Sequence, residues 1–319
     1  MRRFHAAALG IVLALASISA GAQQYPTRPV RLVVPLAAGG PSDSAARVVG
    51  RAFSQRIGQP VIIDNRAGAD GAIAADLVLR APPDGHTLLW GSTSPLLGVP
   101  LLSKKPPYDP TTFSPISLIS RNSLFLYSHP GLPVKTVSEL IDYARANPDK
   151  LYYATSTFGD VVAAAMFMKA AGISMTRVPY KGAAFAIPDL LAGRVQVAVA
   201  PGSAGLPYVK DGRLRALAVF LPERSSAAPT VPTMAESGIP GFKGVWVGVF
   251  GPPNMSRDLT ERLSRELNAL LQQPEVRAQL NQLGLEVAGS TPQALAAYLE
   301  EELARFGRIV REYKIAAQD

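Results

Sequence analysis

The sequence has no cysteine and only three histidines among its 319 residues. The lack of cysteine excludes a disulfide scaffold, a thiolate zinc site, a thiol nucleophile and lipid attachment through an N-terminal cysteine. So few histidines leave little material for metal coordination or for acid–base catalysis. We therefore expect no metal site, no cofactor and no catalytic residues.

The patterns of common enzyme and nucleotide sites are also missing. No G-x-S-x-G nucleophile elbow occurs, since Ser203 has Pro201 in place of the first glycine. The turn at residues 65–71 carries only Gly68 and Gly71, so the dinucleotide fingerprint fails, and no P-loop sequence is present. Nothing singles out a carboxylate pair of the glycosidase type.

The two histidines beyond the N-terminus lie at turns. His86 follows Pro83-Asp84-Gly85 before an expected strand, and we expect it to be exposed to solvent rather than to bind a ligand. His129 begins a loop. Neither stands beside a recognisable nucleophile, so an exported enzyme remains an alternative that the pattern does not favour.

The excess of positive charge is small and diffuse. The formal net charge is +8, but the only adjacent lysines are Lys104 and Lys105, and no run of five basic residues occurs. Zinc-finger, basic-zipper and RNA-recognition patterns are missing. We expect solvated surface charge and no nucleic-acid partner.

The first 22 residues have the pattern of a secretory signal peptide. Arg2 and Arg3 precede an apolar run at residues 6–19, and Ala20-Gly21-Ala22 forms a small-residue cleavage site. The run is shorter than the roughly 18 residues that span a membrane. We expect cleavage after Ala22 and export to the periplasm, with an uncleaved N-terminal anchor as the alternative. Cleavage removes two arginines and leaves a charge of 30 − 24 = +6.

The remaining chain alternates short apolar runs with helical periodicity, which predicts an α/β fold with mainly parallel sheets flanked by helices. The expected strands are residues 30–34, 61–63, 87–90, 151–154, 175–178, 195–200 and 214–219, with extended apolar segments at 116–127 and 245–250. The expected helices are residues 45–57, 71–80, 161–171, 184–191, 257–272, 274–283 and 292–313.

The two extended apolar segments suggest that the chain crosses between two lobes twice. We expect a discontinuous first lobe of residues 23–122 and 248–319 and a second lobe of residues 123–247. A hinge of two crossing strands, near 121–127 and 244–250, then leaves a cleft between the lobes. Two consecutive domains joined by one linker are the alternative, but the C-terminal helices are too few to bury a core alone.

The strongest candidate for a ligand site is the turn at residues 35–43, which ends the first strand and opens the first helix. Its glycines, Gly39 and Gly40, allow close approach of a ligand, and free N–H groups at a helix start favour a carboxylate or phosphate. A plain strand-to-helix turn is equally compatible. The turns near Gly68 and at Ser92-Thr93-Ser94 fall on the same edge of the predicted sheet, where open α/β sheets bind ligands.

An ordered set of motifs runs along the chain: residues 25–35 (Tyr-Pro-x-Arg-Pro-Val-Arg-Leu-Val-Val-Pro), the Ala-Gly-Gly-x-x-Asp turn ending at Asp43, and the stretches at 59–69, 83–88, 178–182 and 231–238. This set resembles the Bug family, the receptors of tripartite tricarboxylate transporters. The resemblance implies a type II periplasmic-binding-protein fold, closure on a small carboxylate-bearing solute, and docking of a monomer onto membrane permease subunits. A sensor that feeds a signalling protein is compatible with the same motifs.

The resemblance also implies a set of ligand-binding residues. In the first lobe they are Leu36, Ala37, Ala38, Gly39, Gly40, Ser42, Asp43, Asn65, Gly68, Ser92, Thr93 and Ser94. In the second lobe they are Thr155, Ser156, Thr157, Phe158, Gly159, Asp160, Tyr180, Lys181, Gly182, Pro201, Gly202 and Ser203.

Some of these positions have alternative structural interpretations. Tyr180 and Lys181 would also suit a solvated strand end, and Ser203 a helix N-cap. Leu36 stands where the family commonly has phenylalanine. Phe158 is expected to wall the pocket. Asp160 either faces the cleft, where it repels a second carboxylate and favours an amine, amide or hydroxyl, or it caps the following helix.

Overall fold

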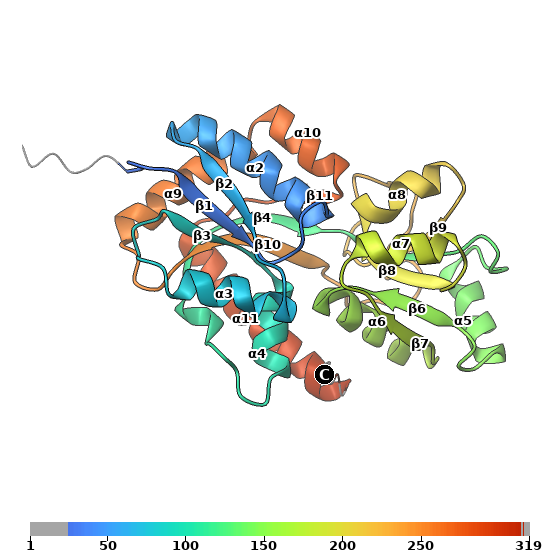
Figure 1. Cartoon of the computed structure of the whole chain (residues 1–319). Helices are drawn as coiled ribbons and strands as arrows, with labels where there is room; N and C mark the ends of the chain where they lie inside the picture. The colour runs from blue at the N-terminus through green and yellow to red at the C-terminus, as the bar shows by residue number, and fades with distance from the viewer. Residues whose placement is uncertain (1–24, 314, 316–319) are drawn as a thin grey trace, which may run out of the picture.

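Two β-sheets with helices on both faces make up the molecule in the computed structural model, which describes residues 25–313 and 315 (Figure 1). The expected signal peptide and its cleavage site lie outside the described residues. Within residues 25–313, no helix is both long enough and apolar enough to span a bilayer.

The first sheet has six strands in the order β11-β4-β10-β3-β1-β2. Strand β1 is parallel to both β2 and β3, whereas β10 is antiparallel to its neighbours β3 and β4. The strands are β1 (Val30–Val34), β2 (Val61–Asn65), β3 (Thr87–Ser92), β4 (Ser114–Asn122), β10 (Val245–Gly251) and β11 (Leu285–Val287).

Both faces of this sheet are covered by helices, and together they form the first lobe. Alternate residues of β10 enter different cores: Val247 packs with one set of helices, and Phe250 with the other. The first set is α2 (Pro41–Ile57), α9 (Arg257–Leu271) and α10 (Pro274–Gln282); the second is α3 (Ala72–Leu79), α4 (Val99–Leu102) and α11 (Pro292–Glu312). Short helical turns lie at Ala69–Gly71, Ser94–Gly98 and Pro110–Thr112.

The second sheet has five strands in the order β7-β6-β8-β5-β9. With its helices it forms the second lobe, where α5 and α6 pack on one face and α7 and α8 on the other (Figure 1). Its strands are β5 (Leu124–Ser128), β6 (Tyr152–Thr155), β7 (Thr176–Pro179), β8 (Val197–Pro201) and β9 (Arg215–Val219). Its helices are α5 (Val137–Ala146), α6 (Phe158–Ala171), α7 (Ala183–Leu191) and α8 (Gly202–Lys210).

The chain passes between the sheets twice, at neighbouring positions. The apolar segment 116–127 is divided at Ser123, which separates β4 of the first sheet from β5 of the second. The return comes before Val245, which already pairs with Asn122 of β4. Residues 245–247 therefore belong to the first sheet, and the return lies earlier than the expected start of the first lobe at 248. The chain leaves the first sheet after β4 and returns to it at β10, and these two strands are neighbours in the sheet.

Two further expectations need correction, and one strand was not expected. Both sheets are mixed rather than mainly parallel, because the strands next to the crossings, β10 and β5, run antiparallel to their neighbours. Strand β11 was missed because it has only three residues, too few for a recognisable strand pattern in the sequence, and it lies at the edge of the sheet. His86 is buried rather than exposed, since its ring packs against Tyr25 with centroids 5.1 Å apart.

Candidate functional site

A cavity of ≈ 260 Å³ lies between the two lobes and is lined by both. We call it the cleft cavity. It brings together most of the residues expected to bind a ligand, although they come from five separate segments of the chain. Those in its wall are Leu36, Ala37, Ala38, Gly39, Gly40, Ser42, Ser92, Thr93, Ser94, Ser156, Thr157, Asp160, Lys181, Gly182, Pro201 and Ser203.

The first turn and the start of α2 form one wall of the cleft cavity. Helix α2 begins after Gly40, which has extended backbone angles, and no side chain caps its first turn. The N–H groups at the start of a helix have no partner within the helix, and the helix dipole places positive partial charge there. Gly39 has φ +83°, where a residue with a side chain would be strained. This wall is suited to an anion.

Asp43 supports this turn from behind rather than lining the cavity. Its Oδ2 accepts hydrogen bonds from the Gly39 N–H at 3.0 Å and from Arg47 Nε at 2.9 Å. Burial alone would raise the pKa of Asp43, but the bonds from Arg47, Gly39 and Asn65 hold it below its usual value. Asn65 also donates to the Leu36 carbonyl at 3.0 Å. Both side chains hold the turn in place.

The end of β3 forms the adjoining part of the wall. Trp90 lies in this strand, and its indole Nε1 donates to Ser42 Oγ at 3.0 Å. Ser94 Oγ accepts a hydrogen bond of 3.3 Å from the Phe158 N–H of the second lobe. The hydroxyl-rich segment after β3 thus faces the start of α6 across the cleft.

In the second lobe, the start of α6 is capped by side chains of its own. Thr157 Oγ1 accepts from the Asp160 N–H, while Asp160 Oδ2 accepts from the N–H groups of Ser156 and Thr157 at 3.0 and 2.9 Å. This is the capping box that one of the two interpretations of Asp160 expects. Asp160 nevertheless belongs to the wall of the cleft cavity, although its side chain is completely buried.

Helices α7 and α8 begin at the same cavity. Gly182 precedes α7 without a side-chain cap, and the exposed Lys181 lies beside it at the rim. Pro201 is the N-cap of α8, so Ser203 lies inside the helix and is not the N-cap. Its hydroxyl is covered and has no hydrogen-bond partner among the described residues.

Eight expected residues do not line the cleft cavity: Asp43, Asn65, Gly68, Thr155, Phe158, Gly159, Tyr180 and Gly202. Gly68 follows β2, the edge strand farthest from the crossings, so its turn lies away from the cavity. Tyr180 donates to Asp189 at 2.7 Å, and burial together with this bond raises the pKa of Tyr180 to about 12. Tyr180 is therefore held by Asp189 rather than solvated, whereas Lys181 is exposed at the rim of the cleft cavity.

Phe158 does not wall the cavity. It is buried at the start of α6 and packs on Phe306 of α11, with ring centroids 5.5 Å apart. Gly159 allows α6 to approach β10, since a Cβ there would lie 2.3 Å from Val245 Cγ1. These residues join the two lobes behind the cleft cavity instead of contacting what it holds.

Sequence reasoning missed a largely apolar part of the wall. These residues lie on strands, inside helices or in the segment before β11, where only the fold places them at the cavity. They are Pro41, Ala45, Trp90, Asn122, Leu124, Ala183, Ala184, Phe185, Val245, Trp246, Val247, Leu283, Gly284 and Leu285. The scarcity of tryptophan was the one sequence feature that could have pointed to this part of the wall, because both tryptophans of the chain line the cavity.

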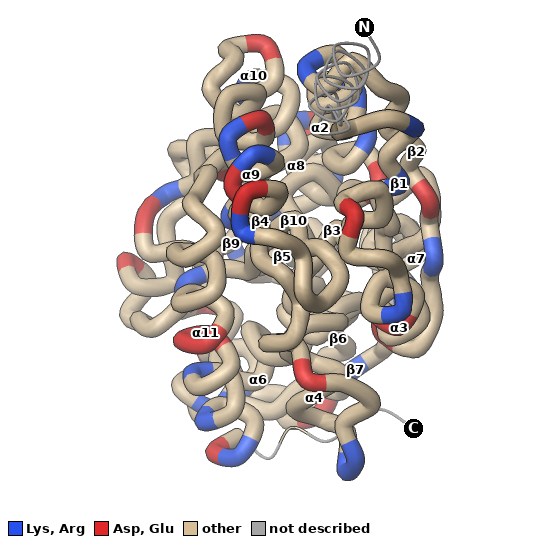
Figure 2. The backbone as a smooth tube through the Cα atoms, turned by 90° about the vertical axis from the view of Figure 1, so that its left-hand side faces the viewer, with Lys and Arg blue, Asp and Glu red and all other residues tan. Residues whose placement is uncertain are grey.

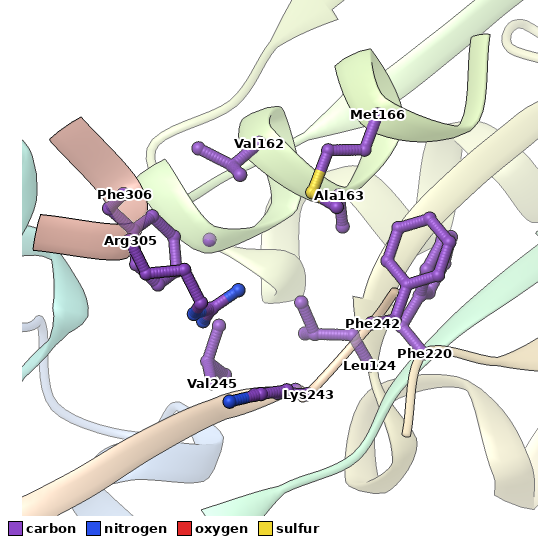
Figure 3. Close-up of a pocket in the computed structure, with 12 residues that line it drawn as sticks. Leu124, Val162, Ala163, Met166, Phe220, Phe242, Lys243, Val245, Arg305 and Phe306 are labelled. Atoms are coloured by element: carbon purple, nitrogen blue, oxygen red, sulfur yellow. The ribbon is translucent and has the colours of Figure 1, made fainter. Parts of the chain in front are cut away.

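A second, smaller cavity of ≈ 20 Å³ shares Leu124 and Val245 with the first. Figure 3 shows it enclosed by α6, by the segment before β10 and by Arg305 and Phe306 of α11. Its volume corresponds to about one water-sized probe, so it is too small for an organic solute. Of these two neighbouring cavities, only the cleft cavity has room for an organic solute.

Charged residues on the side shown in Figure 2 do not gather in one place. Figure 2 shows basic and acidic segments interspersed along the helices on the side that faces the viewer. Within residues 25–313, no group of three or more histidine, aspartate or glutamate side chains is placed to hold a metal ion.

Comparisons with known proteins agree with this geometry. A family model described as "Tripartite tricarboxylate transporter family receptor" matches residues 45–315. Protein BugT of Bordetella pertussis is 34% identical over 96% of this chain and 96% of its own length. The Rpa4515 protein of R. palustris, solved with adipate, is 34% identical and superposes with a TM-score of 0.86 over 92% of this chain and 99% of that one. MatC from Rhodopseudomonas palustris, solved with malate, is 32% identical. It superposes with a TM-score of 0.82 over 90% of this chain and 100% of that one. The chain belongs to the tripartite tricarboxylate transporter receptor family.

Proposed function

We propose that this protein is a periplasmic receptor that binds a small carboxylate-bearing solute in the cleft cavity. The observation that carries the proposal is the start of α2, which has no side-chain cap and lines a cavity between two lobes. The relatives solved with adipate and malate support the assignment of a carboxylate.

The cavity wall explains how a receptor can bind and then release an anion. Backbone N–H groups hold a carboxylate without a buried counter-charge, so release breaks no buried salt bridge. A micromolar dissociation constant corresponds to about −8 kcal/mol, which a few charge-assisted hydrogen bonds plus burial of the apolar wall can supply.

The rest of the assignment follows from the family and from the topology. We propose that the lobes, residues 25–122 with 245–313 and residues 124–244, close about the two crossings. The closed form then docks as a monomer onto permease subunits, after export and cleavage behind Ala22. The binding residues are the expected ones that line the cleft cavity, with Asp43 and Asn65 as supports of the first turn.

Thermal unfolding in the presence of small carboxylates tests the proposal. A ligand at a hundred times its dissociation constant stabilises the folded state by about 2.7 kcal/mol, which raises the melting temperature. We expect a rise with carboxylates and no turnover of the ligand. A rise with phosphate- or sugar-bearing solutes alone would contradict the carboxylate assignment. Mass spectrometry of the purified protein under native conditions gives an independent reading if a ligand co-purifies.

A further inference from the structure

Five buried side-chain atoms have no hydrogen-bond partner among the described residues. Two of them, Asp160 Oδ1 and Ser203 Oγ, belong to helix starts of the second lobe that line the cleft cavity. A third, Trp246 Nε1, also belongs to a lining residue, but that ring packs on Tyr298 of α11. Buried polar atoms without partners are rare because each costs about 1–3 kcal/mol.

The two oxygens of Asp160 have different surroundings. Oδ2 accepts three hydrogen bonds, from the Ser156 N–H at 3.0 Å, from Ser156 Oγ at 2.9 Å and from the Thr157 N–H at 2.9 Å. Oδ1 accepts none. The helix cap therefore uses one oxygen of the carboxylate and leaves the other as an unused acceptor on a completely buried residue.

No nearby cation takes up this acceptor. Arg177 is the basic side chain whose charge acts on Asp160, but its Nε donates to Thr155 Oγ1 at 2.7 Å, and it forms no ion pair with Asp160. Lys181 lines the same cavity from the exposed rim, where solvent weakens its attraction for an anion. The buried acceptor at Asp160 thus has no donor among the described residues, and a ligand in the adjoining cavity can supply one.

We propose that the ligand carries a hydrogen-bond donor at its second polar end, an amide, hydroxyl or ammonium group that pairs with Asp160 Oδ1, instead of a second carboxylate. This rests on the proposed function, in which the first carboxylate lies at the start of α2. A second carboxylate beside Asp160 would face a like charge in a poorly solvated wall. Oδ1 is covered in this arrangement, so the wall must shift to admit the donor as the ligand enters.

Dicarboxylates and their monoamides test the proposal, because each pair differs only in whether the second end accepts or donates. The probes are succinate and succinamate, glutarate and glutaramate, and adipate and adipamate, titrated calorimetrically into the full mature chain. At the chain length that fits best, we expect the monoamide to bind at least tenfold more tightly. A dicarboxylate that binds as tightly as its monoamide, or more tightly, overturns the proposal.

The variant Asp160→Asn assigns the preference to this residue. Asparagine keeps an oxygen for the cap and presents an N–H donor in place of the anionic acceptor. We expect the tenfold preference for the monoamide to disappear or reverse. An unchanged preference in the folded variant overturns the role of Asp160. Glu139→Gln is the matched control, because Glu139 occupies the same capping position at the exposed start of α5, with Lys135 N–H donating to it at 2.6 Å.

Lys181, at the rim of the cleft cavity, allows a second test that does not depend on the folding of Asp160→Asn. Should the dicarboxylates bind more tightly in the wild-type protein, and Lys181→Ala remove that advantage, the second end is a carboxylate at Lys181 and the proposal is wrong. Binding of some probes without the monoamide preference contradicts this inference but keeps the proposed function. Failure of every probe, and of other small carboxylates, contradicts the proposed function itself.

Discussion

The indole Nε1 of Trp90 donates a hydrogen bond of 3.0 Å to Oγ of Ser42, which joins strand β3 to the first turn of α2 at the wall of the cleft cavity. Because the serine oxygen accepts from the indole, its own proton is free to be donated elsewhere. The pair thereby fixes a hydroxyl donor next to the free N–H groups of the helix start. An anion bound there gains a donor that is already oriented.

The variant Ser42→Ala is expected to weaken carboxylate binding about five- to tenfold, the equivalent of one ordinary hydrogen bond of about 1 kcal/mol. It also leaves the buried indole of Trp90 without an acceptor, so the melting temperature falls. Calorimetric titration and thermal unfolding measure the two effects separately. Ser44→Ala is the control, since Ser44 lies in the same helix turn but outside the cavity wall. Equal affinities of the Ser42→Ala variant and the wild type would show that the hydroxyl does not contact the ligand.

Ligand binding is expected to change the intrinsic tryptophan fluorescence, because Trp90 and Trp246 are the only tryptophans of the chain and both line the cavity. Replacing Trp246 with phenylalanine leaves Trp90 as the single reporter beside the start of α2. We expect saturable quenching or a spectral shift in this variant, with the dissociation constant found by calorimetry. Emission that stays constant while calorimetry shows saturation would place the ligand away from Trp90.

Asp43 should make stability depend on pH through the first turn. Its pKa is held below the usual value of 3.8, so its carboxylate stabilises the folded state at pH values above the unfolded pKa. This contribution is lost as the pH falls through the folded pKa. We expect Asp43→Asn to lower the melting temperature at pH 7 and to approach the wild type below pH 4.

The control for Asp43 is Asp76→Asn, which removes an exposed ion pair with Arg80 four residues away in the chain. Such surface pairs contribute about 0–1 kcal/mol, so this variant should change stability little at any pH. A gap between wild type and Asp43→Asn that stays constant from pH 7 to pH 3 would contradict the ionic role of Asp43.

Local signals were sufficient to predict the first wall of the site. The turn from Leu36 to Gly40 is a glycine-rich segment between a strand and a helix, and the parallel pairing of β1 with β3 brings it beside Ser92 to Ser94. The turn itself can be read from a few neighbouring residues, and the rule that parallel strands end at one edge of the sheet places the two segments together. The same holds for most strands and helices, whose expected bounds differ from the observed ones by a few residues.

The second wall depends on contacts between segments that are distant in sequence. Phe158 seemed suited to a pocket, but its ring packs on Phe306 of α11, almost 150 residues later in the chain. Trp246 and Leu285 reach the cavity only because β10 and β11 return to the first sheet. His86 is buried because Tyr25 packs on it. No periodicity or motif in the sequence reports these pairings.

The close contact between the lobes at Gly159 gives a final prediction. A Cβ at this position would lie 2.3 Å from Val245 Cγ1, where α6 meets the start of β10 at the return crossing. Gly159→Ala therefore has to push α6 away from β10, at a cost of about 1–3 kcal/mol for overpacking. We expect a lower melting temperature and weaker ligand binding, because the same shift moves Ser156 and Asp160 in the cavity wall.

The control is Gly307→Ala within α11, where the added Cβ meets no atom closer than 3.5 Å. This variant should leave stability unchanged or raise it, since alanine is the better helix former. If both variants unfold at the wild-type temperature, α6 and β10 can separate freely, and the contact at Gly159 does not fix the distance between the lobes.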